Sequence, residues 1–158
     1  MLPDQRLSGI GCQVNMKIDF QGQRAIVTGA GKGIGREIAR VLAECGAKVV
    51  AVSRTLADLD SLRDETGSES VVANLTDARE AAQAAEACGP ADLLVNNAGI
   101  SIPQPLLDTT IDAFDQTLAV NVRAALIFGQ VVAKSLIARG RSGAIVNLSS
   151  QASMVGLR

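Results

Sequence analysis

The sequence predicts an α/β protein built on an open parallel sheet, because strand-like and helix-like segments alternate five times along the chain. The strand-like runs, such as 48–53, are almost continuously apolar and rich in β-branched residues, which is typical of strands buried on both faces. A glycine-rich segment, 28–35, lies between the first strand-like run and the first helical one. Right-handed crossovers would place helices on both faces of a doubly wound sheet with strand order 3-2-1-4-5.

The boundaries of the expected elements follow from apolar runs, helical periodicity and glycine or proline breaks. The segment 97–108 contains Gly99, Pro103 and Pro105 and is expected to be a loop. Strands are expected at 24–28, 48–53, 70–74, 92–96 and 144–148. Helices are expected at about 33–45, 55–64, 76–87 and 111–138.

Threonine side chains are expected to cap three of these helices. Thr55, with Asp58 three residues later, resembles a capping box. Thr76 and Thr110 stand where they can cap the next two helices. In the first helix, apolar residues recur at helical spacing and are expected to form the buried face: Ile34, Ile38, Val41, Leu42 and Cys45.

Length and composition fit one folded domain and exclude several classes of function. The chain has 158 residues, of which 47% are hydrophobic and 20% charged, and its formal net charge is −1. We therefore expect neither a nucleic acid nor a membrane as partner, and no apolar run approaches the length that spans a bilayer. Three widely spaced cysteines predict no metal site and fit a reducing, cytoplasmic location: Cys12, Cys45 and Cys88.

The glycine-rich segment has the context of a phosphate-binding turn. Glycines let the backbone turn tightly and approach a ligand closely, and the N–H groups at the start of the next helix can face an anion. A plain loop is the alternative, because a glycine cluster alone is a weak signal. The candidate residues are Gly29, Gly31, Lys32, Gly33, Ile34 and Gly35.

The glycine spacing and three later segments resemble the short-chain dehydrogenase/reductase family of the single-domain type. The turn has the spacing G-x-x-x-G-x-G, not the general dinucleotide fingerprint G-x-G-x-x-G. Residues 96–99 match the family's N-N-A-G segment, Asn121 its helix asparagine, and Ser149-Ser150 its serine element. The resemblance implies a Rossmann-type fold with cofactor at the carboxyl ends of the first and fourth strands, beside Asn97, Ala98 and Gly99.

The residues after the second strand favour NADP(H) as cofactor. A carboxylate there would bind the two ribose hydroxyls of NAD, but this chain has Ser53 and then Arg54. Lys32 comes from the glycine turn, which meets that loop beside the adenosine ribose in this fold, and two cations suit a 2′-phosphate. Solvated loop charges are the alternative for both cations. The resemblance places Asn74 and Leu75 beside the adenine, with an ordinary turn as the alternative for Asn74.

Two further segments, 52–62 and 143–151, resemble the L-xylulose (dicarbonyl) reductase and tetrameric carbonyl reductase branch of the family. This branch implies NADPH-dependent reduction of a ketose, an α-dicarbonyl or a small ketone to an alcohol. The expected partners are therefore a small carbonyl or sugar-alcohol substrate and further copies of the chain, in a tetramer or dimer.

Of the four catalytic residues that the resemblance implies, this chain contains two. Ser150 would hydrogen-bond the substrate carbonyl or the family's catalytic tyrosine, and Asn121 would hold a water of the proton relay. A helix N-cap and a polar break in a helix are the respective alternatives. The family's tyrosine and lysine are expected beyond Arg158, and the chain contains neither tyrosine nor histidine. The chain alone is therefore expected to be inactive as a reductase.

The domain prediction follows from these matches. Residues 1–15 lack periodicity and are expected to be a disordered extension, with Met1 or Met16 as the start. Residues 16–158 are expected to form an incomplete NADP-binding Rossmann-type domain, truncated before strands 6 and 7. Two alternatives stay open: a non-catalytic dinucleotide-binding module and a truncated product without function.

Overall fold

A five-stranded parallel sheet organises residues 18–150, the part of the chain that the structure, a computed structural model, describes. The strands lie in the order β3-β2-β1-β4-β5, which confirms the predicted doubly wound topology, and each neighbouring pair is parallel. The predictions for residues 1–15, for Met16 and for the segment after Ser150 lie outside the described residues. The strands are β1 Arg24–Thr28, β2 Lys48–Ser53, β3 Glu69–Val72, β4 Leu93–Asn96 and β5 Ala144–Asn147.

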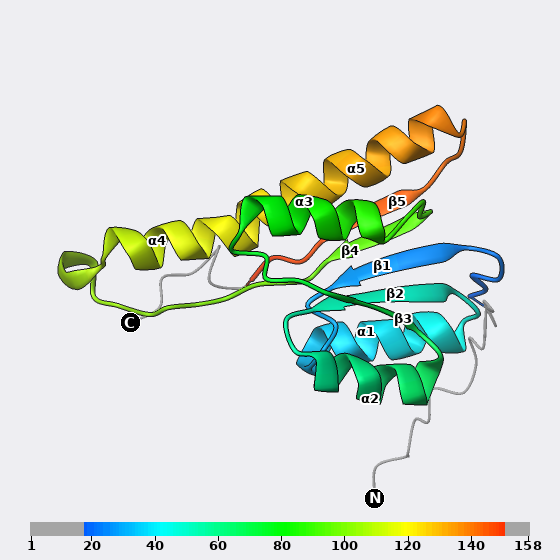
Figure 1. Cartoon of the computed structure of the whole chain (residues 1–158), viewed down its shortest axis with the longest axis horizontal. Helices are drawn as coiled ribbons and strands as arrows, with labels where there is room; N and C mark the ends of the chain where they lie inside the picture. The colour runs from blue at the N-terminus through cyan, green and yellow to red at the C-terminus, as the bar shows by residue number, and fades with distance from the viewer. Residues whose placement is uncertain (1–17, 151–158) are drawn as a thin grey trace, which may run out of the picture.

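Helices cover both faces of this sheet, as right-handed crossovers require. They are α1 Gly33–Glu44, α2 Leu56–Thr66, α3 Ala78–Ala87, α4 Ile111–Leu118 and α5 Ala125–Ala138, with a π-helical segment, η2 Ala119–Ala124, between the last two. A short 3-10 helix, η1 Leu106–Asp108, lies within the predicted loop. Figure 1 shows α1 and α2 on one face of the sheet and α3 and α5 on the other.

Two apolar cores, one on each face, explain why the strands are almost continuously apolar. Successive side chains of a strand point to opposite faces. Ile26 accordingly packs in the core under α3 and α5, where Phe128 is fully buried. Its neighbour Val27 packs in the other core with Leu59 and Leu62 of α2. Both faces of the central strands are therefore covered, whereas the edge strand β5 is exposed along its length.

The buried face of α1 differs from the prediction. Ile34 and Val41 are exposed, at 68% and 47%, although the periodicity placed them in the core. Gly35 and Ala39 are the buried residues instead. A Cβ on Gly35 would overlap the Gly29 carbonyl, so α1 lies against the glycine turn through its smallest residues. The predicted Ile38 and Leu42 are partly buried against the core, so the prediction is correct for part of this face.

The helix caps were predicted with mixed success. Thr110 Oγ1 accepts a hydrogen bond from the Ala113 backbone N–H at 3.2 Å, which confirms the cap of α4. Thr55 occupies the N-cap position of α2, but its side chain makes no capping hydrogen bond. The cap of α3 is Asp77, not Thr76, because Asp77 Oδ1 accepts from two backbone N–H groups at 2.8 and 2.9 Å. A carboxylate is a strong acceptor at this position.

The expectation that no apolar stretch reaches membrane-spanning length needs correction. The helical stretch Ile111–Ala138 passes that test by length and composition, with a mean hydropathy of 1.4 in its most apolar window. A core helix of a soluble protein passes the same test. Phe128, Val132 and Leu136 are buried against the sheet, but only 28% of the most apolar window is buried. The stretch is therefore only a weak indication of a membrane span.

Candidate functional site

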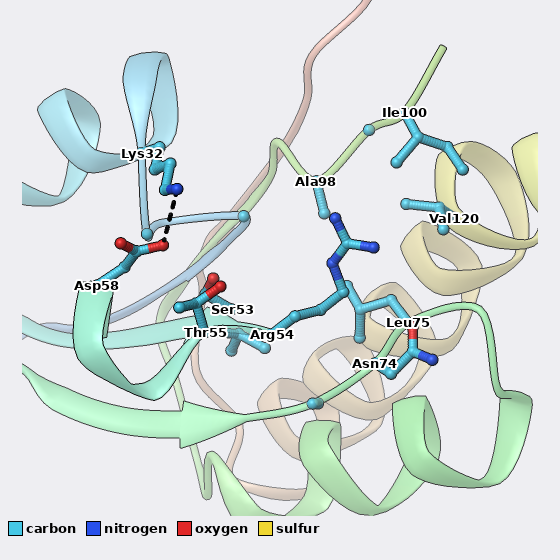
Figure 2. Close-up of a pocket in the computed structure, with 15 residues that line it drawn as sticks. Lys32, Ser53, Arg54, Thr55, Asp58, Asn74, Leu75, Ala98, Ile100 and Val120 are labelled. Carbon is cyan, nitrogen blue, oxygen red and sulfur yellow. Dashed lines mark ion pairs between the residues drawn. The ribbon is translucent and has the colours of Figure 1, made fainter. Parts of the chain in front are cut away.

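A cavity of about 280 Å³ opens at the carboxyl edge of the sheet, among the loops that follow β1, β2, β3 and β4 (Figure 2). These loops meet there because the strands are parallel and end at the same edge. Ligands of doubly wound sheets bind at this edge, where the strand order reverses. The structure brings most of the predicted binding residues to the lining: Gly29, Gly31, Lys32, Ser53, Arg54, Asn74, Leu75, Ala98 and Gly99.

The glycine turn fits tightly between its neighbours on two sides. A Cβ on Gly29 would lie 2.8 Å from the Cα of Ala98, and one on Gly31 would lie 2.6 Å from Ser53 Oγ. Gly29 also has a positive φ of 68°, which disfavours other residues. These glycines therefore let three loops approach one another around the cavity.

Gly33, Ile34 and Gly35 form the first turn of α1 and do not line the cavity. Gly33 has a φ of 55° and nothing within 4 Å of the position of a Cβ, so the space beside it is open. This open space at the N-terminus of a helix is suited to an anion. Ile34 points outward, and Gly35 is packed on the turn.

Asn97 holds two loops together and does not line the cavity. Its Nδ2 donates to the backbone carbonyl oxygens of Thr28 and Gly29, at 2.9 and 3.3 Å. Thr28 Oγ1 accepts from the backbone N–H groups of Asn97 and Ala98, both at 3.1 Å. The buried Thr28 was not singled out from the sequence, although a hydroxyl at the end of a strand beside a glycine turn is a usable signal.

Among the described residues, three charged side chains line the cavity, although the sequence predicted two. Lys32 Nζ lies 3.5 Å from Asp58 Oδ2, so Lys32 is engaged in an ion pair. Figure 2 shows this pair on one side of the cavity and Arg54 reaching across it toward Ala98. The two cations thus share one cavity but do not converge on one point. Asp58 had been interpreted only as part of a capping box.

Asn74 adopts the turn that was its alternative interpretation, while it also lines the cavity. Its Oδ1 accepts from the Thr76 backbone N–H at 3.2 Å and from the Thr76 hydroxyl at 2.9 Å. Leu75, only 6% exposed, gives the cavity an apolar wall next to it. A flat apolar group could pack on Leu75.

The two candidate catalytic residues lie at the same edge of the sheet but outside the cavity lining. Asn121 lies in the π-helical segment η2, between α4 and α5. Both ends of its side-chain amide bind the backbone of Ile100, which does line the cavity. Ser150 follows β5, next to β4 in the sheet. At the ends of these two strands, Asn96 Nδ2 donates to Asn147 Oδ1 at 2.8 Å, a contact that sequence reasoning missed.

The clearest pKa shifts belong to groups near the amino ends of the strands. Burial raises the pKa of the Cys88 thiol to about 12, so this thiol is protonated and unreactive at neutral pH. Hydrogen bonding from the Arg24 backbone N–H, together with Arg141 and Arg139, lowers the pKa of Asp92. Within residues 18–150, no cluster of three or more histidine, cysteine, aspartate or glutamate side chains could hold a metal ion.

Comparison with known proteins gives the family. The family model of short chain dehydrogenases matches residues 23–158. The chain belongs to the short-chain dehydrogenase family.

Among its relatives, L-xylulose reductase of Bos taurus is 54% identical over 143 residues, which are 90% of this chain and 59% of the relative. Carbonyl reductase [NADPH] 2 of Sus scrofa is 50% identical over 141 residues, or 89% of this chain and 58% of the relative. The crystal structure of a metagenomic short-chain oxidoreductase in complex with NADP superposes with a TM-score of 0.79 at 35% identity, over 87% of this chain and 66% of that one. The chain thus spans less than two thirds of the length of these relatives.

Proposed function

We propose that this chain is part of an NADPH-dependent reductase that converts a small carbonyl compound to an alcohol. The observation that carries the proposal is the charge at the end of β2. Lys32 and Arg54 line one cavity there, and β2 ends in Ser53 where a carboxylate would favour NAD. The relatives named for L-xylulose and carbonyl reduction support a ketose, an α-dicarbonyl or a small ketone as substrate.

The residues around the cavity supply donors that suit an NADP dinucleotide. Glycine turns and the open N-terminus of α1, at Gly33, suit the diphosphate. We propose that Lys32, Ser53 and Arg54 bind the 2′-phosphate and that Leu75, with Asn74, lies against the adenine. The remaining proposed cofactor contacts are Gly29, Gly31, Ile34, Gly35, Asn97, Ala98 and Gly99.

The chain supplies only part of the proposed chemistry. Bound NADPH would supply the hydride. We propose that Ser150 donates a hydrogen bond to the substrate carbonyl and that Asn121 supports the proton relay through its position in η2. The alkoxide left by hydride transfer needs an acid, and these 158 residues contain no tyrosine and no histidine. We therefore propose that the 158 residues alone bind cofactor without turnover.

A non-catalytic dinucleotide-binding module is the second candidate function. This chain supplies the lining residues of the cavity from Gly29 to Val120, and its sequence has no tyrosine and no histidine. We also propose a cytoplasmic location and a homo-oligomer. Exposed apolar side chains on one helical stretch support self-association: Leu118, Val122 and Leu126.

The proposed cofactor preference can be tested by calorimetric titration of the chain with NADPH and NADH. We expect Lys32→Gln and Arg54→Gln each to weaken NADPH binding by about tenfold, since each removes a charge-assisted contact to phosphate, and to leave NADH binding nearly unchanged. Arg63→Gln is the matched control, because Arg63 lies on α2 and pairs with Asp60 at 2.8 Å outside the cavity. Equal loss in the control, or tighter binding of NADH than of NADPH by the parent chain, would refute the proposal.

A further inference from the structure

Among the described residues that line the cavity, Asp58 carries the one acidic side chain. It lies in the first turn of α2, where the positive end of the helix dipole stabilises its negative charge. A negative charge in this place opposes a phosphorylated ligand. An acidic side chain is therefore unexpected in a site for such a ligand.

In the ion pair between Asp58 and Lys32, Asp58 is held in place and the Lys32 side chain is free to change its conformation. Lys32 has a long side chain that is 79% exposed, whereas the Asp58 side chain is only 23% exposed. The backbone at Asp58 is held from α1, because Arg36 Nη1 donates to the Asp58 carbonyl oxygen at 3.1 Å and to that of Gly31 at 3.4 Å. Asp58 Cβ would also lie 3.2 Å from a Cβ on Gly31. The ammonium group of Lys32 is thus the part that can move.

We propose that Asp58 is a specificity-determining residue that acts by holding Lys32. This inference rests on the proposed NADP(H) function of the cavity. A ligand with a 2′-phosphate must draw Lys32 away from Asp58 before it gains that charge contact. A ligand without the 2′-phosphate leaves the ion pair intact. Asp58 therefore lowers the affinity of the site for dinucleotides with a 2′-phosphate and leaves the affinity for those without it unchanged. The ratio of the two affinities is smaller as a result.

The size of the effect follows from the exposure of the pair. Exposed ion pairs contribute little free energy. Releasing Lys32 should therefore change the affinity for a 2′-phosphorylated ligand by about two- to fivefold. The effect should diminish at high salt, because screening weakens both the ion pair and the phosphate contact. If Asp58 acted only by repelling the phosphate directly, its removal would have the same effect whether or not Lys32 is present.

A double-mutant cycle separates these two mechanisms. The full 158-residue chain would be titrated calorimetrically with adenosine 2′,5′-bisphosphate and with 5′-AMP. The variants are Asp58→Asn, Lys32→Gln and the double variant, each checked for folding by circular dichroism, with Asp58→Ala as a second removal of the charge. Asp60→Asn is the matched control, because Asp60 is on the same helix, pairs with Arg63 and does not line the cavity.

We expect Asp58→Asn to tighten binding of the bisphosphate about two- to fivefold and to leave 5′-AMP binding unchanged. In the Lys32→Gln background this gain should fall by more than half. The proposal is overturned if Asp58→Asn and Asp58→Ala leave the bisphosphate affinity unchanged, if Asp60→Asn gives the same gain, or if the gain is independent of Lys32. If the parent chain binds both probes equally, the proposed NADP(H) function itself fails, and this inference falls with it. A parent chain that prefers the bisphosphate but does not respond at Asp58 overturns the inference alone.

Discussion

Asn121 binds the backbone of Ile100 through both ends of its side-chain amide. Its Oδ1 accepts from the Ile100 N–H at 2.8 Å, and its Nδ2 donates to the Ile100 carbonyl oxygen at 2.9 Å. The π-helical segment η2 is thereby fastened to the loop after β4, which lines the cavity. The residue that the sequence marked as a candidate for the proton relay thus also shapes the wall of the proposed cofactor site.

Replacing Asn121 should loosen this wall. We expect Asn121→Ala to lower the free energy of unfolding by about 1–2 kcal/mol, because two hydrogen bonds are lost at an exposed position. Urea denaturation measures this loss. Gln116→Ala is the control, since its Nε2 donates to Asp112 one turn away on α4, and its cost should stay within about 0.5 kcal/mol. Equal losses in the two variants would contradict the assigned role.

Thr28→Val should lower the free energy of unfolding by more than the nearly equal volumes of the two side chains suggest. The Thr28 side chain is buried, and its hydroxyl accepts from two backbone N–H groups at 3.1 Å. Removing this oxygen leaves both donors without that acceptor, so we expect a loss of about 2–3 kcal/mol in unfolding free energy. Thr117→Val is the matched control, because its hydroxyl donates to the Ala113 carbonyl oxygen within its own helix, at 2.8 Å. A loss at Thr28 no greater than at Thr117 would count against this assignment.

Two helical glycines should respond to alanine in opposite directions. In Gly35→Ala the new Cβ would overlap Asn97 and the Gly29 carbonyl, so we expect a loss of about 1–3 kcal/mol and weakened NADPH binding. In Gly129→Ala nothing lies within 4 Å of the new Cβ, and we expect a gain of up to about 1 kcal/mol from helix propensity. Thermal unfolding of both variants checks the pair, and stabilisation by Gly35→Ala would contradict the close packing of α1 on the glycine turn.

Asp92 should make stability depend on acid pH. Only 6% exposed, it accepts from the Arg24 N–H at 3.1 Å, and this bond, with Arg141 and Arg139, lowers its pKa below the ordinary value of 3.8. A carboxyl with a lowered folded pKa stabilises the fold above its unfolded pKa, and this contribution is lost as pH falls through the folded value. Asp92→Asn should therefore cost about 1–3 kcal/mol at pH 7.

Denaturation of the parent chain and Asp92→Asn across pH 7 to 3 would check this prediction. The difference in unfolding free energy should stay constant down to about pH 4 and then shrink. A difference that grows below pH 4 would have the wrong sign for a lowered pKa.

The strand order was predictable because it depends on local signals that agree with one another. Apolar β-branched runs such as 48–53 mark strands buried on both faces, and the glycine turn at 28–35 marks the change from strand to helix. Once all strands are parallel, right-handed crossovers leave few topologies. The position of the cavity at the carboxyl edge then follows from the topology alone.

Features that depend on close three-dimensional approach were not predictable. Ile34 looked like a core residue, yet it is exposed, and the neighbouring Gly35 lies against the glycine turn instead. Thr76 and Asp77 are adjacent and both can cap a helix, so the sequence could not choose between them. The pairing of Lys32 with Asp58 joins two segments that only the folded sheet brings together.

A crystal structure of the 158-residue chain with bound NADPH would test the central proposal most directly. Our account predicts the 2′-phosphate between Lys32 and Arg54, the adenine against Leu75, and the diphosphate at the glycine turn beside Gly33. Lys32 Nζ should have moved from Asp58 to the phosphate. Density for the dinucleotide outside this cavity, or a 2′-phosphate that touches neither cation, would contradict the account.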